Sequence, residues 1–147
     1  MFAILPKSLA FDQSQLREIL AKAMTNKKPT AEQSKIAHEK NTEAPFSSPL
    51  LAEKRTGIYV CAMCATPLFS SANKYDSGSG WPSFFQPLNE TALGTQTDTS
   101  LASPRTEVHC ANCKAHMGHL FPDGPPPTGL RYCINGAVLS FEPDGET

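Results

Sequence analysis

Two short stretches, Cys61-Ala-Met-Cys64 and Cys110-Ala-Asn-Cys113, do most to decide how this chain folds. In each of them two residues separate a pair of cysteines, so one tight turn can direct both thiols at a common centre. Four thiolates suit a tetrahedral Zn²⁺ and leave no coordination position open for a substrate. We therefore predict one structural zinc ion per chain, which would join two segments that lie far apart in the sequence.

Two alternatives to this zinc site stay open at the level of sequence. The two cysteine pairs could be redox-active vicinal dithiols, and His109, His116 or His119 could replace one cysteine as a ligand. His109 adjoins Cys110 and would point the other way on an extended strand, so we interpret it as a surface or core residue.

The composition indicates a single soluble domain with many loops and short strands. The chain has 147 residues, of which 39% are hydrophobic and 18% charged, and it contains thirteen prolines. Its formal net charge is −1. Residues 61–147 carry four basic and eight acidic side chains, which argues against a nucleic-acid partner. No run of about 18 apolar residues occurs, so we expect no membrane span.

The number of cysteines favours a reducing compartment. Five is an odd number, so a closed set of disulfides would leave one thiol over. The first ten residues also do not resemble a secretory signal. We therefore expect a cytoplasmic protein, in which paired cysteines serve metal or redox chemistry.

Periodicity divides the chain into an N-terminal helical extension, residues 1–40, and a catalytic domain, residues 41–143. Apolar residues recur at helical spacing over 11–24, and a second helix is predicted from about Ala31 to Lys40, capped by Thr30. Residues 41–55 are expected to be coil. Strands are predicted at 57–61, 84–88, 106–110, 119–121 and 130–141, the last interrupted by Gly136.

The fifth cysteine lies in the run Leu130-Arg131-Tyr132-Cys133-Ile134-Asn135, which alternates with period two. As a strand, this run places Arg131, Cys133 and Asn135 on one face. A guanidinium beside a thiol favours the nucleophilic thiolate, and an amide can orient a bound group. The alternative is that Cys133 is a small buried hydrophobic residue, although three polar or reactive side chains on one face suit a cleft better than a core.

Two further features could serve chemistry at such a cleft. His116 and His119 follow the second cysteine pair, so a rigid support could present either imidazole as a proton donor, although exposed histidines often need no such role. Trp81 follows the flexible run Ser77-Gly78-Ser79-Gly80. Its indole could be a plug over the core or the wall of an apolar pocket for a methyl-thioether-like group.

Taken together, these motifs resemble the methionine-R-sulfoxide reductase B family. The matching segments are Tyr59-Val-Cys-Ala-Met-Cys64, Pro67-Leu-Phe69, Lys74-Tyr-Asp-Ser-Gly78, Gly80-Trp-Pro-Ser-Phe84, Cys110-Ala-Asn-Cys113, His116-Met-Gly-His119 and residues 121–135 almost continuously. The resemblance implies a mainly β fold of two antiparallel sheets with short N-terminal helices and a structural zinc site at Cys61, Cys64, Cys110 and Cys113, remote from catalysis.

The resemblance also implies an activity, the reduction of the R epimer of methionine sulfoxide in oxidised proteins or peptides. In that reaction Cys133 would be the nucleophile and would end as a sulfenic acid. Trp81 would receive the methyl group of the substrate, and His116 and His119 would handle protons. The remaining pocket residues implied by the resemblance are Arg131, Phe121 and Asn135.

The chain departs from a common family pattern at Ser79, where many members carry a resolving cysteine. The protein is then either a natural one-cysteine form, reduced by thioredoxin, glutaredoxin or a small thiol, or a form in which Ser79 is an engineered replacement.

A competing hypothesis is a non-catalytic, zinc-stapled β-domain that binds a protein partner. This hypothesis explains the four paired cysteines but not the polar face at Cys133.

Overall fold

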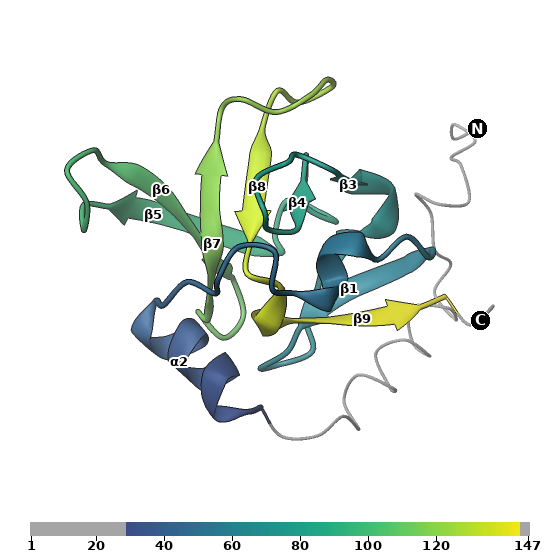
Figure 1. Cartoon of the computed structure of the whole chain (residues 1–147), viewed down its shortest axis with the longest axis horizontal. Helices are drawn as coiled ribbons and strands as arrows, with labels where there is room; N and C mark the ends of the chain where they lie inside the picture. The colour runs from purple at the N-terminus through teal and green to yellow at the C-terminus, as the bar shows by residue number, and fades with distance from the viewer. Residues whose placement is uncertain (1–28, 145–147) are drawn as a thin grey trace.

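The computed structural model describes residues 29–144, which form two antiparallel β-sheets and, within this range, one α-helix (Figure 1). The smaller sheet has the strand order β2-β1-β9, formed by Pro67–Ser70, Gly57–Cys61 and Leu139–Pro143. The larger sheet has the order β3-β4-β8-β7-β6-β5, formed by Lys74–Tyr75, Ser83–Phe84, Arg131–Ile134, His116–Phe121, Arg105–Cys110 and Leu93–Asp98. The predicted fold class, mainly β with two antiparallel sheets, is confirmed.

Aromatic side chains join the two sheets. Phe69 of β2 stacks on Phe84 of β4 with ring centroids 4.1 Å apart. Tyr59 of β1 meets the same ring edge to face at 5.2 Å. All three side chains are fully buried, and such ring pairs add stability beyond their burial alone. Because β1 and β2 belong to the smaller sheet and β4 to the larger one, the hydrophobic core lies between the sheets.

The predicted strand over 130–141 is two strands in different sheets. The chain leaves β8 after Ile134 and makes a short 3₁₀ turn, η3, over Gly136–Val138. It then enters β9 in the smaller sheet. The interruption expected at Gly136 is confirmed, and a glycine is needed there because a Cβ would overlap the side chain of Ser48.

The predicted helix near residues 31–40 is observed as α2, Ala31–Glu39. Thr30 accepts a hydrogen bond from the backbone of Gln33, whose side chain bonds back to Thr30, so the predicted cap is a full capping box. Ile36 and Ala37 are buried, and α2 packs against β7 and η3. The helix expected at 11–24 lies outside the described residues, and the boundary near residue 40 stays a prediction. Over 29–144 no helix is both long and apolar enough to span a membrane.

Several short strands differ from the sequence expectation. The strand predicted at 84–88 is reduced to β4, Ser83–Phe84, and β7 begins three residues before the predicted 119. Strands β2, β3 and β5 were not predicted. β5, Leu93–Asp98, has no apolar alternation because it is the outer strand of the larger sheet and most of its side chains are exposed or half-buried. The expected coil over 41–55 contains one 3₁₀ turn, η1, Pro49–Ala52.

Strands β7 and β8 come unusually close at Gly118. This glycine pairs with Ile134, and a Cβ built on it would overlap the backbone carbonyl oxygen of Cys133. A side chain at this position would therefore push the two strands apart.

We expect Gly118→Ala to lower the free energy of unfolding by about 1–3 kcal/mol, because the added methyl overpacks the β7–β8 pair. Urea denaturation of the purified chain measures this loss. Thr97→Ala, on the exposed face of β5, is the matched control and should cost less than about 0.5 kcal/mol. Equal stability of the Gly118→Ala variant and the parent chain would contradict the proposed close packing.

Candidate active site and metal centre

The four paired cysteines meet at one point of the fold. The sulfur atoms of Cys61, Cys64, Cys110 and Cys113 all lie within 4.8 Å of one another. The Cys61–Cys113 and Cys64–Cys110 sulfur distances are 3.7 and 3.6 Å. A tetrahedral zinc with Zn–S bonds of about 2.3 Å separates its sulfurs by about 3.8 Å. The donor set and its spacing therefore fit a closed metal site with four thiolate ligands.

The two cysteine turns have the same backbone geometry. In one turn the amide of Ala65 donates to the carbonyl of Cys61 at 2.8 Å, and in the other Lys114 donates to Cys110 at 2.9 Å. Ala65 and Lys114 have left-handed φ angles of 66° and 68°. One turn follows β1 of the smaller sheet and the other follows β6 of the larger one. A metal ion bound by all four sulfurs would thus join the two sheets.

No histidine belongs to this metal-ligand group among the described residues. His109 lies instead beside Glu107, with its Nδ1 3.3 Å from Oε1 of the carboxylate. It is half-buried, in agreement with the interpretation of His109 as a surface or core residue. The alternative in which a histidine replaces a cysteine ligand is therefore not favoured.

A separate pocket of about 290 Å³ contains the fifth cysteine. Most of the predicted site residues line it, and the sequence analysis did not predict Thr42 or Arg105 as part of it. The lining residues are Thr42, Ser79, Trp81, Arg105, Gly118, His119, Phe121, Arg131, Cys133 and Asn135. Trp81 is half-buried in this lining, which favours the wall over the plug.

The pairing of β7 with β8 aligns the reactive side chains. His119 lies opposite Cys133, and Phe121 lies opposite Arg131. Directly opposed residues project from the same face of a sheet, so all four line the pocket. Ile134 belongs to the opposite face and is fully buried, which confirms the predicted alternation.

The environment of Cys133 opposes formation of the thiolate at rest. Burial raises the pKa of the Cys133 thiol, although a hydrogen bond with Ser79 and the charge of Arg131 act against this shift. The Ser79 Oγ atom is 3.8 Å from the Cys133 sulfur. The expected effect of the guanidinium is therefore present but is outweighed by burial.

The charge of Arg131 is largely committed elsewhere. Its Nε and one Nη donate to the two carboxylate oxygens of Asp123 at 2.8 and 3.1 Å. Its guanidinium also lies over the ring of Phe121, 4.3 Å from the centroid. This pairing fixes Arg131 in the wall of the pocket and reduces the positive charge that Cys133 experiences.

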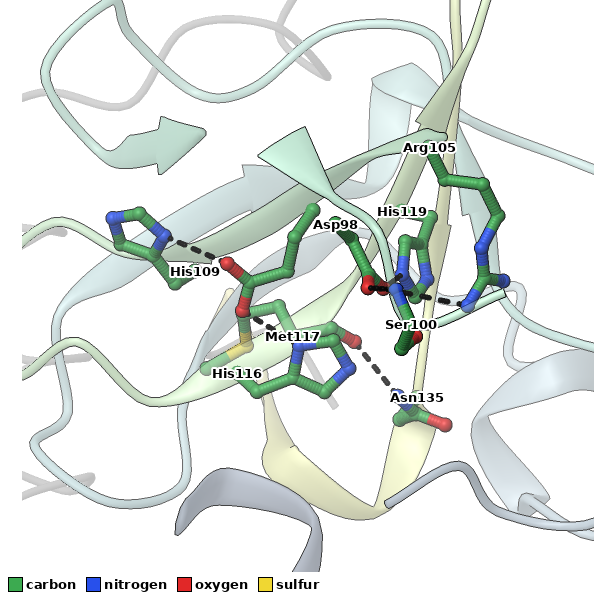
Figure 2. A network of polar contacts seen from close by, with 9 residues as sticks. Asp98, Ser100, Arg105, His109, His116, Met117, His119 and Asn135 are labelled. Atoms are coloured by element: carbon green, nitrogen blue, oxygen red, sulfur yellow. Dashed lines mark hydrogen bonds and ion pairs between the residues drawn. The ribbon is translucent and has the colours of Figure 1, made fainter. Parts of the chain in front are cut away.

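His119 is oriented by a carboxylate that the sequence analysis missed (Figure 2). Its Nε2 atom lies 2.7 Å from Oδ2 of Asp98, at the end of β5. Hydrogen bonds from Ser100 and His119 hold the pKa of Asp98 well below its usual range, so Asp98 is ionised. Arg105 completes the group, with an Nη atom 3.4 Å from Asp98. Because β5 was not predicted, no sequence signal connected Asp98 with the site.

His116 does not line the pocket. Its Nδ1 atom is 2.7 Å from Oε2 of Glu107, and its side chain is only 2% exposed. Burial lowers the pKa of His116, and the hydrogen bond and charge of Glu107 oppose this only in part. The buried imidazole is therefore harder to protonate than a free histidine, and its ring centroid lies 5.5 Å from that of His119.

A register shift in the β6–β7 ladder brings the two histidines side by side. Val108 pairs with Gly118 but His109 pairs with His116, so Met117 has no partner in that ladder. The free carbonyl of Met117 instead accepts hydrogen bonds from the backbone amide and the side-chain amide of Asn135, at 2.8 and 3.0 Å. The Asn135 amide is thus occupied by backbone partners although it lines the pocket.

Comparison with known proteins identifies close relatives. A SelR domain model matches residues 30–143. The peptide methionine sulfoxide reductase MsrB of Saccharophagus degradans is 56% identical over 115 residues, which are 78% of this chain and 86% of that protein. The MsrB of Pseudomonas putida is 54% identical, over 76% of this chain and 84% of its own length. The rat mitochondrial methionine-R-sulfoxide reductase B2 is 51% identical, over 84% of this chain and 75% of that protein.

We expect iodoacetamide to alkylate Cys133 more slowly than a free cysteine at pH 7. Its alkylation rate should rise through a pH range above the ordinary thiol value of about 8.5, because burial disfavours the thiolate. Peptide mass spectrometry over a pH series assigns the rate to Cys133.

Two variants give this measurement its controls. Arg131→Gln should raise the inflection pH, since the guanidinium favours the thiolate, and Asp123→Asn should lower it, since the carboxylate opposes the thiolate. A parent inflection below that of free cysteine would show that burial does not dominate.

Proposed function

This chain belongs to the methionine-R-sulfoxide reductase B family, and we propose that its Cys133 pocket reduces methionine-R-sulfoxide in oxidised proteins and peptides to methionine. It is then a peptide-methionine (R)-S-oxide reductase, an oxidoreductase that acts on sulfur. The observation that carries the proposal is the placement of Cys133 opposite His119, in a pocket lined also by Trp81. A non-catalytic β-domain gives no reason for this placement.

Binding would use the two aromatic residues of the pocket. The methyl group of the sulfoxide would lie against the indole of Trp81, and Phe121 would form the neighbouring wall under Arg131. An apolar wall accepts the methyl and methylene groups next to sulfur, whereas the polar sulfoxide oxygen needs a hydrogen-bond donor. His119 is the donor that the opposing strand supplies.

The chemical step would be an attack of the Cys133 sulfur on the sulfoxide sulfur. As that bond forms, Cys133 loses its proton and the sulfoxide oxygen gains one, so the unfavourable thiolate need not build up beforehand. The oxygen then bonds to the Cys133 sulfur while the substrate S–O bond and the new S–S bond break, which releases methionine and leaves a sulfenic acid on Cys133. The substrate sulfur is reduced by two electrons and the Cys133 sulfur is oxidised by two.

The Asp98–His119 pair would provide the proton for the oxygen. Asp98 binds Nε2 of His119 at 2.7 Å, which would leave Nδ1 for the substrate. His116 would act through His119, because it does not line the pocket. Arg131 and Asn135 would hold the pocket around the reacting atoms.

The sulfenic acid would need an external thiol. All five cysteines of the chain are described, and the four other than Cys133 form the metal-ligand group. Ser79 lies against Cys133 where a resolving cysteine would be needed, and a hydroxyl cannot form a disulfide. We therefore propose thioredoxin, glutaredoxin or a small thiol as the reductant.

We further propose that the four-cysteine group binds a structural Zn²⁺. A closed shell of four thiolates supplies no open position for a substrate, so the ion would stabilise the joint between the sheets. Maintaining these thiolates and a reactive Cys133 favours a reducing compartment, for which we propose the cytoplasm. Within this scheme residues 41–143 would form the catalytic domain and residues 1–40 an extension.

The zinc proposal predicts one zinc ion per purified chain by elemental analysis. Cys110→Ser should lose most of the zinc and unfold at a lower temperature, because the two sheets lose their shared ion. Cys133→Ser, which removes the thiol outside the group, should keep the zinc. A parent chain without zinc and with four freely titrating thiols in the group would refute the assignment.

The activity proposal predicts turnover of peptides containing methionine-R-sulfoxide with dithiothreitol as reductant, and no turnover of the S epimer. Cys133→Ser should lower the rate by at least about a thousandfold, because the hydroxyl cannot accept the oxygen. Chromatography of the peptide products measures both results. A Cys133→Ser variant that keeps its zinc and still reduces the R epimer would overturn the proposed nucleophile.

A further inference from the structure

Glu43 is a buried charged residue that has no role in the mechanism described so far. It lies in the coil between α2 and η1, and it is only 5% exposed. Its neighbour Thr42 lines the Cys133 pocket. Burying a carboxylate costs free energy unless its oxygens accept hydrogen bonds. The contacts of Glu43 therefore indicate which part of the structure it stabilises.

The backbone of Glu43 joins two residues of the pocket. Its amide donates to Oδ1 of Asn135 at 2.9 Å. Its carbonyl accepts from the indole Nε1 of Trp81 at 3.0 Å. These two side chains come from different parts of the chain, the loop before β4 and the residue just after β8, and Glu43 bonds to both.

The carboxylate of Glu43 accepts hydrogen bonds from the two residues that follow Asn135. Oε2 accepts from the amide of Gly136 at 2.8 Å, and Oε1 accepts from the amide of Ala137 at 2.8 Å. Both amides follow Asn135 directly in the chain. The side chain and the backbone of Glu43 thus both bond to the segment 135–137. The side-chain amide of Asn135 also donates to the carbonyl of Met117 in β7 (Figure 2).

A second bond holds this coil against the tryptophan loop. The amide of Phe46 donates to the carbonyl of Gly80 at 2.7 Å. Gly80 immediately precedes Trp81, so the loop is tied to the coil at two consecutive residues. The position of the indole therefore depends on the coil, and the coil depends on the Glu43 carboxylate.

We propose that Glu43 is a positioning residue that sets the location of the Trp81 indole relative to β8, and through it the size of the substituent that the pocket accepts on the sulfoxide sulfur. The inference rests on the proposed function, in which Trp81 receives the methyl group. Without the Glu43 carboxylate the indole loses its fixed distance from Cys133, and the pocket discriminates less well between a methyl group and a larger alkyl group.

The test compares the R-sulfoxides of methionine and ethionine, in the same peptide, with the parent chain and Glu43→Gln. Glutamine keeps the shape, but its NH₂ group faces a backbone amide and one hydrogen bond is lost. We expect kcat/KM for methionine-R-sulfoxide to fall about tenfold, and the methyl-to-ethyl preference to fall at least about threefold. Trp81 is the only tryptophan, so its fluorescence should shift to the red as the indole loosens.

Glu142→Gln is the matched control, because Glu142 is a buried glutamate on β9 in the other sheet. It should leave both the substrate preference and the Trp81 emission unchanged. If Glu43→Gln does not fold, Glu43→Asp, which withdraws the carboxylate by one methylene group, is tested in the same way.

A variant that lowers kcat/KM for both substrates by the same factor, or that leaves the Trp81 emission unchanged, would overturn the positioning role. Glu43 would then be a purely structural residue. Failure of the proposed function itself is seen separately, because the parent chain would then reduce neither sulfoxide.

Discussion

The positions of the reactive side chains depend on one ladder, the antiparallel pairing of β7 with β8. This pairing places His119 opposite Cys133 and Phe121 opposite Arg131. It is possible only because Gly118 offers no side chain to the Cys133 carbonyl. A slip of one residue would turn Cys133 into the core and Ile134 into the pocket. The full burial of Ile134 and the place of Cys133 in the pocket favour the observed register.

The environment of Cys133 favours a neutral thiol at rest over a permanently charged thiolate. Burial outweighs the help that Arg131 and Ser79 give to the thiolate, and Asp123 takes up much of the arginine charge. A resting thiol is also less prone to unwanted oxidation than a thiolate. In the proposed mechanism the ionised Asp98 holds His119, the proton donor on the facing strand. Proton movement and sulfur attack can then occur together when a sulfoxide is bound.

Features of the fold and of the site could be predicted from the sequence where they depend on residues that lie close together in the chain. The cysteine pairs, the alternation around Cys133 and the Thr30 cap are local patterns, and all three appear as expected. Asp98 was missed because β5 is an exposed outer strand without alternation. Glu43 was missed because its bonds to Trp81 and Asn135 cross 38 and 92 residues of sequence. The register shift beside His116 has no sequence signature, so the two histidines could not be told apart in advance.

In the proposed reaction one sulfur atom, that of Cys133, accepts the substrate oxygen, and no thiol of the same chain removes it. The most direct measurement is a single turnover without reductant, in which the reduced chain meets one equivalent of an R-sulfoxide peptide and dimedone then traps sulfenic acid for mass spectrometry. We expect one methionine per chain, one dimedone adduct at Cys133 and no disulfide within the chain. Methionine formed with Cys133 unmodified, or with Cys133 joined to a cysteine of the metal-ligand group, would contradict the account.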